Sequence, residues 1–120
     1  METKKVLIIE DDIEIRDSLK YVLEMEGFEV KTARNGLDGL DHLLTTTELP
    51  NAILLDIMMP VMDGYQFREH QLKFENLATI PTVVISADRN FQQKAQHLKF
   101  HELIKKPIDL DHLIQVLNTI

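Results

Sequence analysis

The sequence predicts an α/β fold in which a mostly parallel sheet is covered by helices. Three observations support this fold class. Short apolar runs rich in β-branched residues recur along the chain, amphipathic stretches lie between them, and Pro, Gly or acidic residues stand at the boundaries. Five strand and helix units account for the 120 residues, which is the usual size of one domain. We therefore expect a single domain over residues 1–120.

Three strong strands and two weaker ones are expected. The strong strands are continuous apolar runs, as is typical of parallel strands buried on both faces, and they cover 6–9, 52–55 and 83–85. The segment 28–32 alternates apolar and polar residues after Gly27, and 103–104 is bounded by charges and Pro107. Both weaker strands are therefore expected at the flanks of the sheet.

Five helices are expected from apolar residues at helical spacing. The first is marked by Ile15, Leu19 and Leu23 and ends near Gly27. Asp109 is a candidate N-cap for the last helix. The apolar stripes of the other four helices are Leu37, Leu40 and Leu44; Tyr65, Phe67 and Phe74; Phe91, Ala95 and Leu98; and Leu110, Leu113, Ile114 and Leu117.

Composition excludes several classes of function. The chain has no cysteine, so disulfides, thiolate metal sites and cysteine nucleophiles are absent. The net charge of −7, with 13 scattered Lys and Arg residues, argues against direct binding of nucleic acid. The first apolar run is too short for a signal peptide or a membrane span, so a cytoplasmic location without membrane contact is expected. The last helix reaches almost to Ile120, so we expect no output domain within the chain.

Acidic residues follow two of the three strong strands. Glu10, Asp11 and Asp12 come directly after the first strand, and Asp56 follows the third. The carboxyl ends of parallel strands meet at one edge of a sheet, so these side chains lie close together if the two strands are adjacent. Crowded carboxylates call for a cation, and oxygen ligands suit Mg²⁺ better than Zn²⁺. The alternative is that each acid is an ordinary N-cap or a solvated turn residue.

A hydroxyl and an ammonium group are expected at the same edge. Ser86 directly follows the fourth strand, and Lys106 with Pro107 follows the fifth. An acceptor carboxylate, a metal, a hydroxyl donor and a lysine together make a phosphoryl-binding site. Taken alone, Ser86 is a turn former and Lys106 a solvated charge, so their joint placement is what indicates the site.

Four segments of the chain resemble the receiver domain of two-component response regulators, and the resemblance covers essentially the whole chain. They are 8–12 with Arg16, 55–64, 84–87 and 106–107. The resemblance implies a five-stranded, flavodoxin-like parallel sheet of strand order 2-1-3-4-5 in three α/β/α layers. It also implies a phosphorelay signalling switch that catalyses its own phosphorylation and dephosphorylation and is not otherwise an enzyme. The expected partners are a histidine kinase or histidine phosphotransfer protein as donor, and an unidentified downstream protein.

The same resemblance implies the acceptor and the metal ligands. Asp56 is the expected phosphoacceptor, and Glu10 and Asp11 are the expected acidic pair that holds Mg²⁺ together with Asp56. Asp12 falls outside this pair. The backbone carbonyl of Met58 is expected to complete the protein ligands of the metal.

The resemblance further assigns the phosphoryl contacts. Ser86 is expected to contact a phosphoryl oxygen, and Lys106 is expected to form a salt bridge to the phosphate. The peptide bond between Lys106 and Pro107 is expected to be cis. In-line attack by Asp56 then follows the positioning and charge-neutralising logic of other phosphoryl transfers.

Two positions depart from the family pattern. Lys99 and Phe100 replace the small Gly-Ala pair that usually precedes the fifth strand, which indicates a reshaped surface. Leu103 lies where many receivers carry an aromatic switch residue. A leucine has no polar group to exchange between two positions, so we expect the movement of Ser86 to be transmitted through the loop 87–89.

Three other interpretations fit the sequence less well. Small phosphatases with an aspartyl-phosphate intermediate resemble a pattern that carries a second Asp two residues after the nucleophilic Asp. This chain has Met58 at that position. A degenerate receiver that acts only as a scaffold is disfavoured because all the expected site residues are present. His97 and His101 would bind a metal only if one helix carried both, and the fourth helix is expected to end near Leu98.

Overall fold

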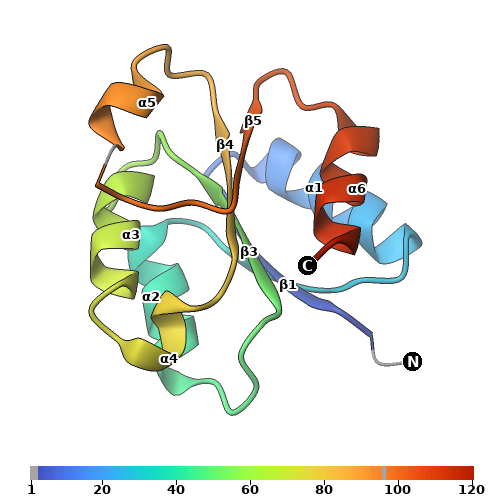
Figure 1. Ribbon diagram of the computed structural model, residues 1–120. Coiled ribbons are helices and arrows are strands. Elements are labelled where there is room, and N and C mark those ends of the chain that lie inside the picture. Colours follow the sequence, from blue (N-terminus) through green and yellow to red (C-terminus); the bar gives the residue numbers. More distant parts are fainter. Residues whose placement is uncertain (1–2, 96) are drawn as a thin grey trace.

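Five parallel strands lie side by side in the computed structural model, which describes residues 3–95 and 97–120 (Figure 1). Their order across the sheet is β2-β1-β3-β4-β5. The strands are β1 (Lys5–Ile9), β2 (Glu29–Ala33), β3 (Ala52–Asp56), β4 (Thr82–Ser86) and β5 (Glu102–Lys105). The helices are α1 (Ile13–Met25), α2 (Gly36–Thr45), α3 (Gly64–Gln71), α4 (Glu75–Ala78), α5 (Phe91–Lys94) and α6 (Leu110–Asn118). The predicted fold class and strand order are confirmed.

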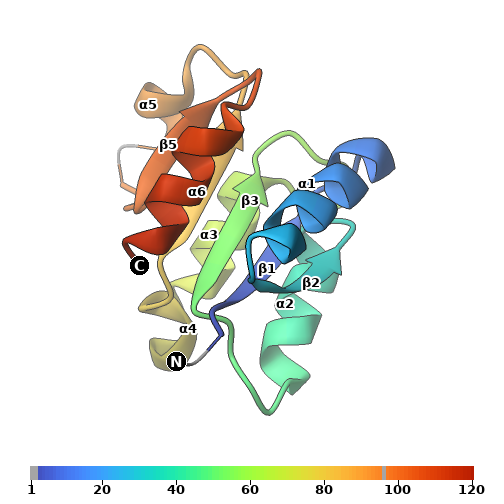
Figure 2. The ribbon, with the colours of Figure 1, turned by 90° about the vertical axis from the view of Figure 1, so that its right-hand side faces the viewer.

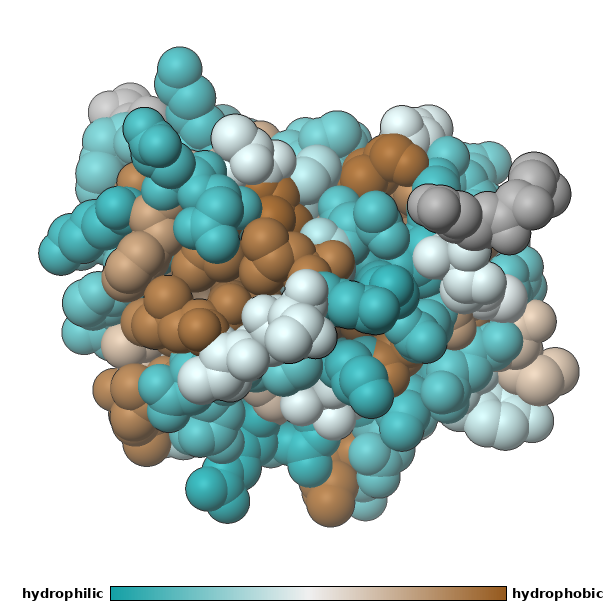
Figure 3. All heavy atoms as spheres, turned by 90° about the horizontal axis from the view of Figure 1, so that it is seen from below, coloured by the Kyte–Doolittle hydropathy of each residue, from teal (hydrophilic) through white to brown (hydrophobic). Residues whose placement is uncertain are grey.

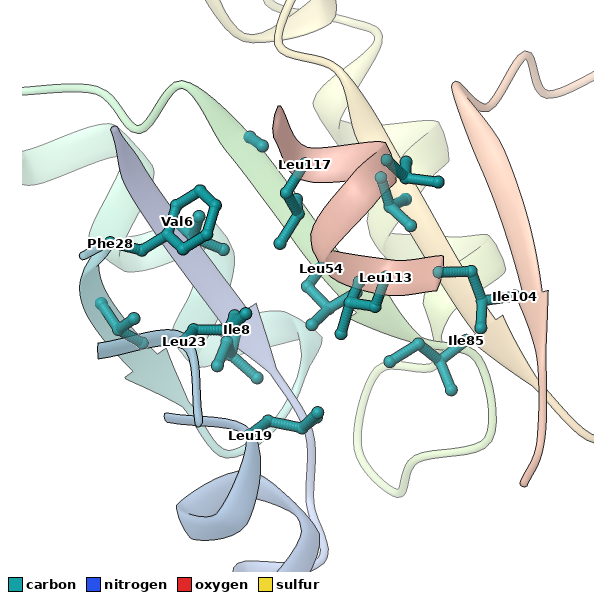
Figure 4. Packing of buried hydrophobic residues seen from close by; sticks show 14 residues of the cluster. Val6, Ile8, Leu19, Leu23, Phe28, Leu54, Ile85, Ile104, Leu113 and Leu117 are labelled. Carbon is teal, nitrogen blue, oxygen red and sulfur yellow. The ribbon is translucent and has the colours of Figure 1, made fainter. Parts of the chain in front are cut away.

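Helices cover both faces of the sheet, and each face has its own core (Figure 2). Between the sheet, α1 and α6, the strand residues Val6, Ile8 and Leu54 pack with Leu19 and Leu113 (Figure 4). The alternate strand residues face α2, α3 and α4, and the fully buried members of that cluster are Leu7, Ile9, Ile53, Leu55, Phe67 and Leu77. Burial on both faces explains why the central strands are continuous apolar runs.

The register of the central strands aligns their carboxyl ends. Ile9 pairs with Leu55, and Leu55 pairs with Val84 on the other side. Asp56 is the last residue of β3 and pairs with Ile85. The residues that follow β1, β3 and β4 therefore leave the sheet at one edge.

The third predicted helix is wrong in extent, because the chain forms two helices there. Helix α3 ends at Gln71, and Phe74 stands at the N-terminus of the separate short helix α4. The buried Gln71 side chain donates from Nε2 to the carbonyl of Leu77 at 2.9 Å. This contact ties the end of α3 to α4, so the chain bends where apolar spacing alone predicts a continuous helix.

The fourth predicted helix is shorter than expected, and one residue of the last helix is misplaced. Helix α5 ends at Lys94, although Leu98 is still buried. The carbonyl of Lys99 accepts a hydrogen bond from Arg68 of α3, which holds the segment before β5 against α3. Asp109 caps α6 as predicted, but Leu110 is 38% exposed and lies outside the buried stripe.

The edge of the sheet opposite the strand carboxyl ends carries an apolar area on the side of α3 and α4 (Figure 3). The exposed apolar residues at this edge include Leu44 of α2, with Leu72 at the end of α3 and Phe74 at the start of α4. Among the helices in the described part of the chain, none has the length and apolarity needed to cross a bilayer.

Gly64 allows α3 to start directly beneath β3. A Cβ atom at this position would lie 2.8 Å from the carbonyl oxygen of Asp56 and 2.6 Å from Cδ1 of Ile57. We expect Gly64→Ala to lower the free energy of unfolding by roughly 1–3 kcal/mol, because backbone must shift to accommodate the methyl group. Urea unfolding measures this loss.

Gly39 provides a matched control inside α2. Its added Cβ would meet mainly Cδ1 of Ile9, at 2.5 Å, which is the end of a flexible side chain. In a helix interior, alanine is also more favourable than glycine by up to about 1 kcal/mol. Gly39→Ala should therefore lose less stability than Gly64→Ala, and the opposite ranking would contradict this explanation.

Candidate functional site

The candidate site lies at the carboxyl ends of β1, β3, β4 and β5. Glu10 follows β1 and its backbone N–H donates to the carbonyl of Ala33 at 3.0 Å. The backbone N–H of Lys106 donates to the carbonyl of Ser86 at 3.0 Å, which joins the ends of β4 and β5. Asp56 ends β3 between them. The fold thus places the predicted acids, hydroxyl and ammonium at one edge.

Three carboxylates meet at this edge. Glu10, Asp11 and Asp56 each offer an oxygen, and these oxygens lie within 4.8 Å of one another. Glu10 is 2% exposed and Asp56 is 4% exposed, whereas Asp11 is at the surface. Among the described residues, neither oxygen of Glu10 nor Oδ1 of Asp56 has a hydrogen-bond partner. Buried carboxylate oxygens without donors are costly, and a hard divalent cation with oxygen ligands fits this set.

Lys106 supplies the ammonium group of the site. Its Nζ lies 3.3 Å from Oδ1 of Asp56 and 3.8 Å from Oε1 of Glu10. One ammonium faces three carboxylates, so the pocket keeps an excess of negative charge. Arg16 uses its guanidinium elsewhere, because Nη1 donates to the backbone carbonyl of Glu10 at 3.1 Å.

Burial of Glu10 beside another carboxylate shifts its pKa. Burial and the neighbouring Asp56 carboxylate raise the pKa of Glu10 to about 9, and Lys106 opposes the shift. Without a cation, burial and this neighbour therefore favour the protonated form of Glu10. A bound divalent cation would displace that proton, as metal ligands are usually deprotonated.

Asp12, which the sequence places outside the acidic pair, caps α1. Its Oδ1 accepts hydrogen bonds from the backbone N–H groups of Glu14 at 2.9 Å and Ile15 at 3.2 Å. The ordinary N-cap interpretation is thus correct for this one acid of the run, and the other two point to the pocket.

Ser86 is buried at the opposite side of Asp56 from β1. Its Oγ accepts a hydrogen bond from the backbone N–H of Asp88 at 2.9 Å. A cavity of about 730 Å³ opens beside it, lined in part by Leu103 and Lys106. The peptide bond between Lys106 and Pro107 is cis.

The loop after Asp56 is fixed by backbone contacts. The N–H of Ile57 donates to the carbonyl of Ile85 at 3.3 Å, and the N–H of Gly64 donates to the carbonyl of Ile57 at 2.9 Å. Met58 is 63% exposed, and only its backbone carbonyl is expected to contact the metal. A metal contact by that carbonyl stays a prediction.

His97 and His101, which would bind a metal only if one helix carried both, do not share a helix. Helix α5 ends at Lys94, and His101 precedes β5, where its N–H donates to the carbonyl of Thr82 at 2.9 Å. His97 instead lies 3.9 Å from a carboxylate oxygen of Glu69. The structure thus gives no support to a histidine metal site here.

Sequence reasoning missed a polar contact behind Ser86. The Tyr65 hydroxyl donates to Oδ2 of Asp88 at 2.9 Å, and Nζ of Lys94 lies 3.1 Å from the same oxygen. Hydrogen bonds from Asn90, Tyr65 and Lys94 lower the pKa of Asp88, so this carboxylate is charged. The only signal in the sequence is an acid two residues after Ser86, which is also typical of any turn.

A second missed contact explains one departure from the family pattern. The buried Arg68 guanidinium lies over the ring of Phe100, 5.3 Å from its centroid, and donates to Lys99 O and to Thr82 Oγ1. Lys99 and Phe100 therefore serve as partners for Arg68. Nothing in the linear sequence pairs residues 31 positions apart.

Comparison with known proteins agrees with this geometry. The model of the response regulator receiver domain matches residues 6–118. The chain is 39% identical over 83 residues to a transcriptional regulatory protein CpxR homolog of Haemophilus influenzae, covering 69% of this chain and 34% of that protein. It is 29% identical over 113 residues to sporulation initiation phosphotransferase F of Bacillus subtilis, covering 94% of this chain and 90% of that protein.

Solved structures share the fold. The signal receiver domain of a signal transduction histidine kinase from Syntrophus aciditrophicus superposes with a TM-score of 0.85 at 27% identity, covering 98% of this chain and 92% of that one. The chain spans only 34% of the length of the Haemophilus influenzae relative. The family match covers nearly the whole chain and includes every residue of the acidic pocket. This chain therefore belongs to the family of response regulator receiver domains.

Proposed function

We propose that Asp56 accepts a phosphoryl group beside a Mg²⁺ ion held by Glu10, Asp11, Asp56 and the carbonyl of Met58. The observation that carries this proposal is the buried carboxylate pair of Glu10 and Asp56, which faces a single ammonium, Nζ of Lys106, 3.3 Å from Oδ1 of Asp56. A stable core does not need such a pair, because an apolar pair of similar size avoids the desolvation cost. We attribute the presence of this pair to chemistry at Asp56.

The residues divide the work of phosphoryl transfer. Asp56 supplies the nucleophilic oxygen, which forms a bond to phosphorus as the bond to the donor breaks and its electron pair leaves with the donor. Lys106 offsets the charge on the transferred phosphoryl oxygens, and the Ser86 hydroxyl donates to one of them. When bound, Mg²⁺ would supply further neutralisation of these oxygens. Attack of water on the acyl phosphate returns the carboxylate of Asp56 and releases phosphate.

We further propose a phosphohistidine on a histidine kinase or a histidine phosphotransfer protein as the natural donor. Membership of the receiver family supports this, because these domains act with such partners in two-component systems. The phosphorylated domain then signals to a downstream protein. The acidic balance of −7 supports a protein partner over direct contact with nucleic acid.

Intact-mass spectrometry tests the assignment of Asp56. With acetyl phosphate and Mg²⁺, the wild type should gain the mass of one phosphoryl group, and Asp56→Asn should gain none. Asp12→Asn is the matched control, because this acid caps α1 and lies outside the pocket. The control should be labelled like the wild type. Equal labelling of Asp56→Asn would reject Asp56 as the acceptor.

A further inference from the structure

Asp88 connects Ser86 to two neighbouring elements. Its backbone N–H donates to Oγ of Ser86 at 2.9 Å, and its Oδ1 accepts from the N–H of Asn90 at 2.9 Å. Its other oxygen accepts from the Tyr65 hydroxyl of α3 at 2.9 Å and from Lys94 of α5 at 3.1 Å. The Asp88 side chain is only 10% exposed. A movement of Ser86 is therefore transmitted first to Asp88 and then to Tyr65.

The ring of Tyr65 is held independently of its hydroxyl. It stacks on Phe91 with 6.0 Å between ring centroids, and Phe91 contacts Phe100 at 5.5 Å. Arg68, one turn further along α3, lies over the far side of this aromatic row on Phe100. Removing the hydroxyl alone leaves the ring packing in place, so the bond to Asp88 can be tested separately from the core.

The loop 87–90 has room to move. The cavity of about 730 Å³ lies between this loop and β5, and its lining includes Ser86, Asp88, Phe91 and Leu103. An aromatic side chain at position 103 would fill more of this space than leucine does. With Leu103 in place, the loop can shift without first displacing a large side chain.

We propose that the Tyr65 hydroxyl stabilises the unphosphorylated position of the loop 87–90, and that its bond to Asp88 breaks when Ser86 moves toward a phosphoryl group on Asp56. This inference rests on the proposed function. Tyr65, which lies on α3, then has the role that an aromatic residue at position 103 has in many receivers. It is a positioning residue, because it acts on Ser86 through Asp88 and touches no phosphoryl atom.

The order of breaking follows from the lengths of the connections. Ser86 and Asp88 are two residues apart, so the hydroxyl and the N–H move together as one turn. Tyr65 is 23 residues away on another element, and water can replace its single hydrogen bond. The Lys94 contact is a partly exposed ion pair on a flexible side chain and resists the movement little. A conformational change is biased only by contacts that differ between its two states, and the Tyr65 bond is such a contact.

Beryllofluoride, a phosphoryl mimic, tests the proposal when it is titrated with Mg²⁺. Tyr65→Phe removes the stabilising bond of the unphosphorylated state, so its apparent dissociation constant should fall roughly three- to tenfold below that of the wild type. Tyr21→Phe is the matched control, because this tyrosine lies on α1 and is 67% exposed. Its dissociation constant should equal that of the wild type.

Tyrosine emission gives a readout that needs no change at Tyr65. The chain has two tyrosines and no tryptophan, so emission from Tyr21→Phe arises from Tyr65 alone. A carboxylate that accepts the phenol hydrogen bond quenches this emission. Emission should rise when beryllofluoride and Mg²⁺ bind, and it should stay constant when Asp56→Asn is combined with Tyr21→Phe.

The outcomes separate this inference from the proposed function. Failure of the wild type to bind beryllofluoride, or equal binding by Asp56→Asn, would reject the phosphoryl site itself. Normal binding by the wild type, with Tyr65→Phe matching Tyr21→Phe and with constant Tyr65 emission, would overturn the inference and leave the site intact. A tighter Tyr65→Phe complex together with the rise in emission supports the breaking of the Tyr65 bond.

Discussion

Replacing Lys106 with Gln is expected to slow the phosphorylation of Asp56 by about two to three orders of magnitude. Loss of one preorganised donor that faces developing charge typically costs a factor of about 10²–10³ in rate. Lys106 is such a donor, because its Nζ lies 3.3 Å from the attacking carboxylate and its backbone N–H is bonded to the carbonyl of Ser86 at the end of β4. Glutamine keeps the polar side chain and removes the charge. The rate of phosphoryl incorporation from acetyl phosphate, followed by mass, measures the effect.

Lys105 offers the matched control for this prediction. It is the adjacent lysine, the last residue of β5, and its side chain is exposed. Lys105→Gln changes the net charge by the same amount as Lys106→Gln, so a long-range electrostatic effect on the donor would appear equally in both variants. We expect the Lys105 variant to react within about twofold of the wild type. Equal slowing of the two would show that Lys106 contributes only net charge.

Asp11→Asn is expected to abolish the stabilisation of the domain by Mg²⁺. At a free Mg²⁺ concentration about 100 times the dissociation constant, binding to the folded state adds about 2.7 kcal/mol to the free energy of unfolding. Asp11 offers one of the three clustered carboxylate oxygens, and an amide is a poorer ligand for a hard cation. Denaturant unfolding with and without Mg²⁺ measures the difference for each variant.

The same substitution should leave the metal-free domain at least as stable as the wild type. Asp11 is one of the charges that raise the pKa of Glu10, so its removal relieves repulsion in the pocket. Asp12→Asn is the control, since asparagine caps a helix about as well as aspartate and Asp12 lies outside the cluster. The control should keep its response to Mg²⁺. A full Mg²⁺ response in Asp11→Asn would place the metal elsewhere.

The sequence by itself determined the fold class and the edge that carries the site. Continuous apolar runs have to be buried on both faces, and that burial produces parallel strands covered by helices. Acids that directly follow two such strands therefore lie at the common carboxyl edge of the sheet. This argument places Glu10, Asp56, Ser86 and Lys106 at one edge, but Glu10 and Asp56 meet only if the first and third strands are adjacent. The strand order itself came from the family resemblance and not from the apolar pattern.

Only the tertiary structure decided where helices end and which side chains meet across the fold. Apolar spacing predicts one helix through Phe74, but the buried Gln71 amide binds a carbonyl beyond the end of α3 and the chain turns. The run of acids looks uniform, yet one of them is a helix cap and two line the pocket. The Tyr65 bond to Asp88 and the Arg68 contact with Phe100 join residues 23 and 32 positions apart. Local patterns carry no information on such pairs, because side-chain direction and the packing of neighbouring elements set them after the chain has folded.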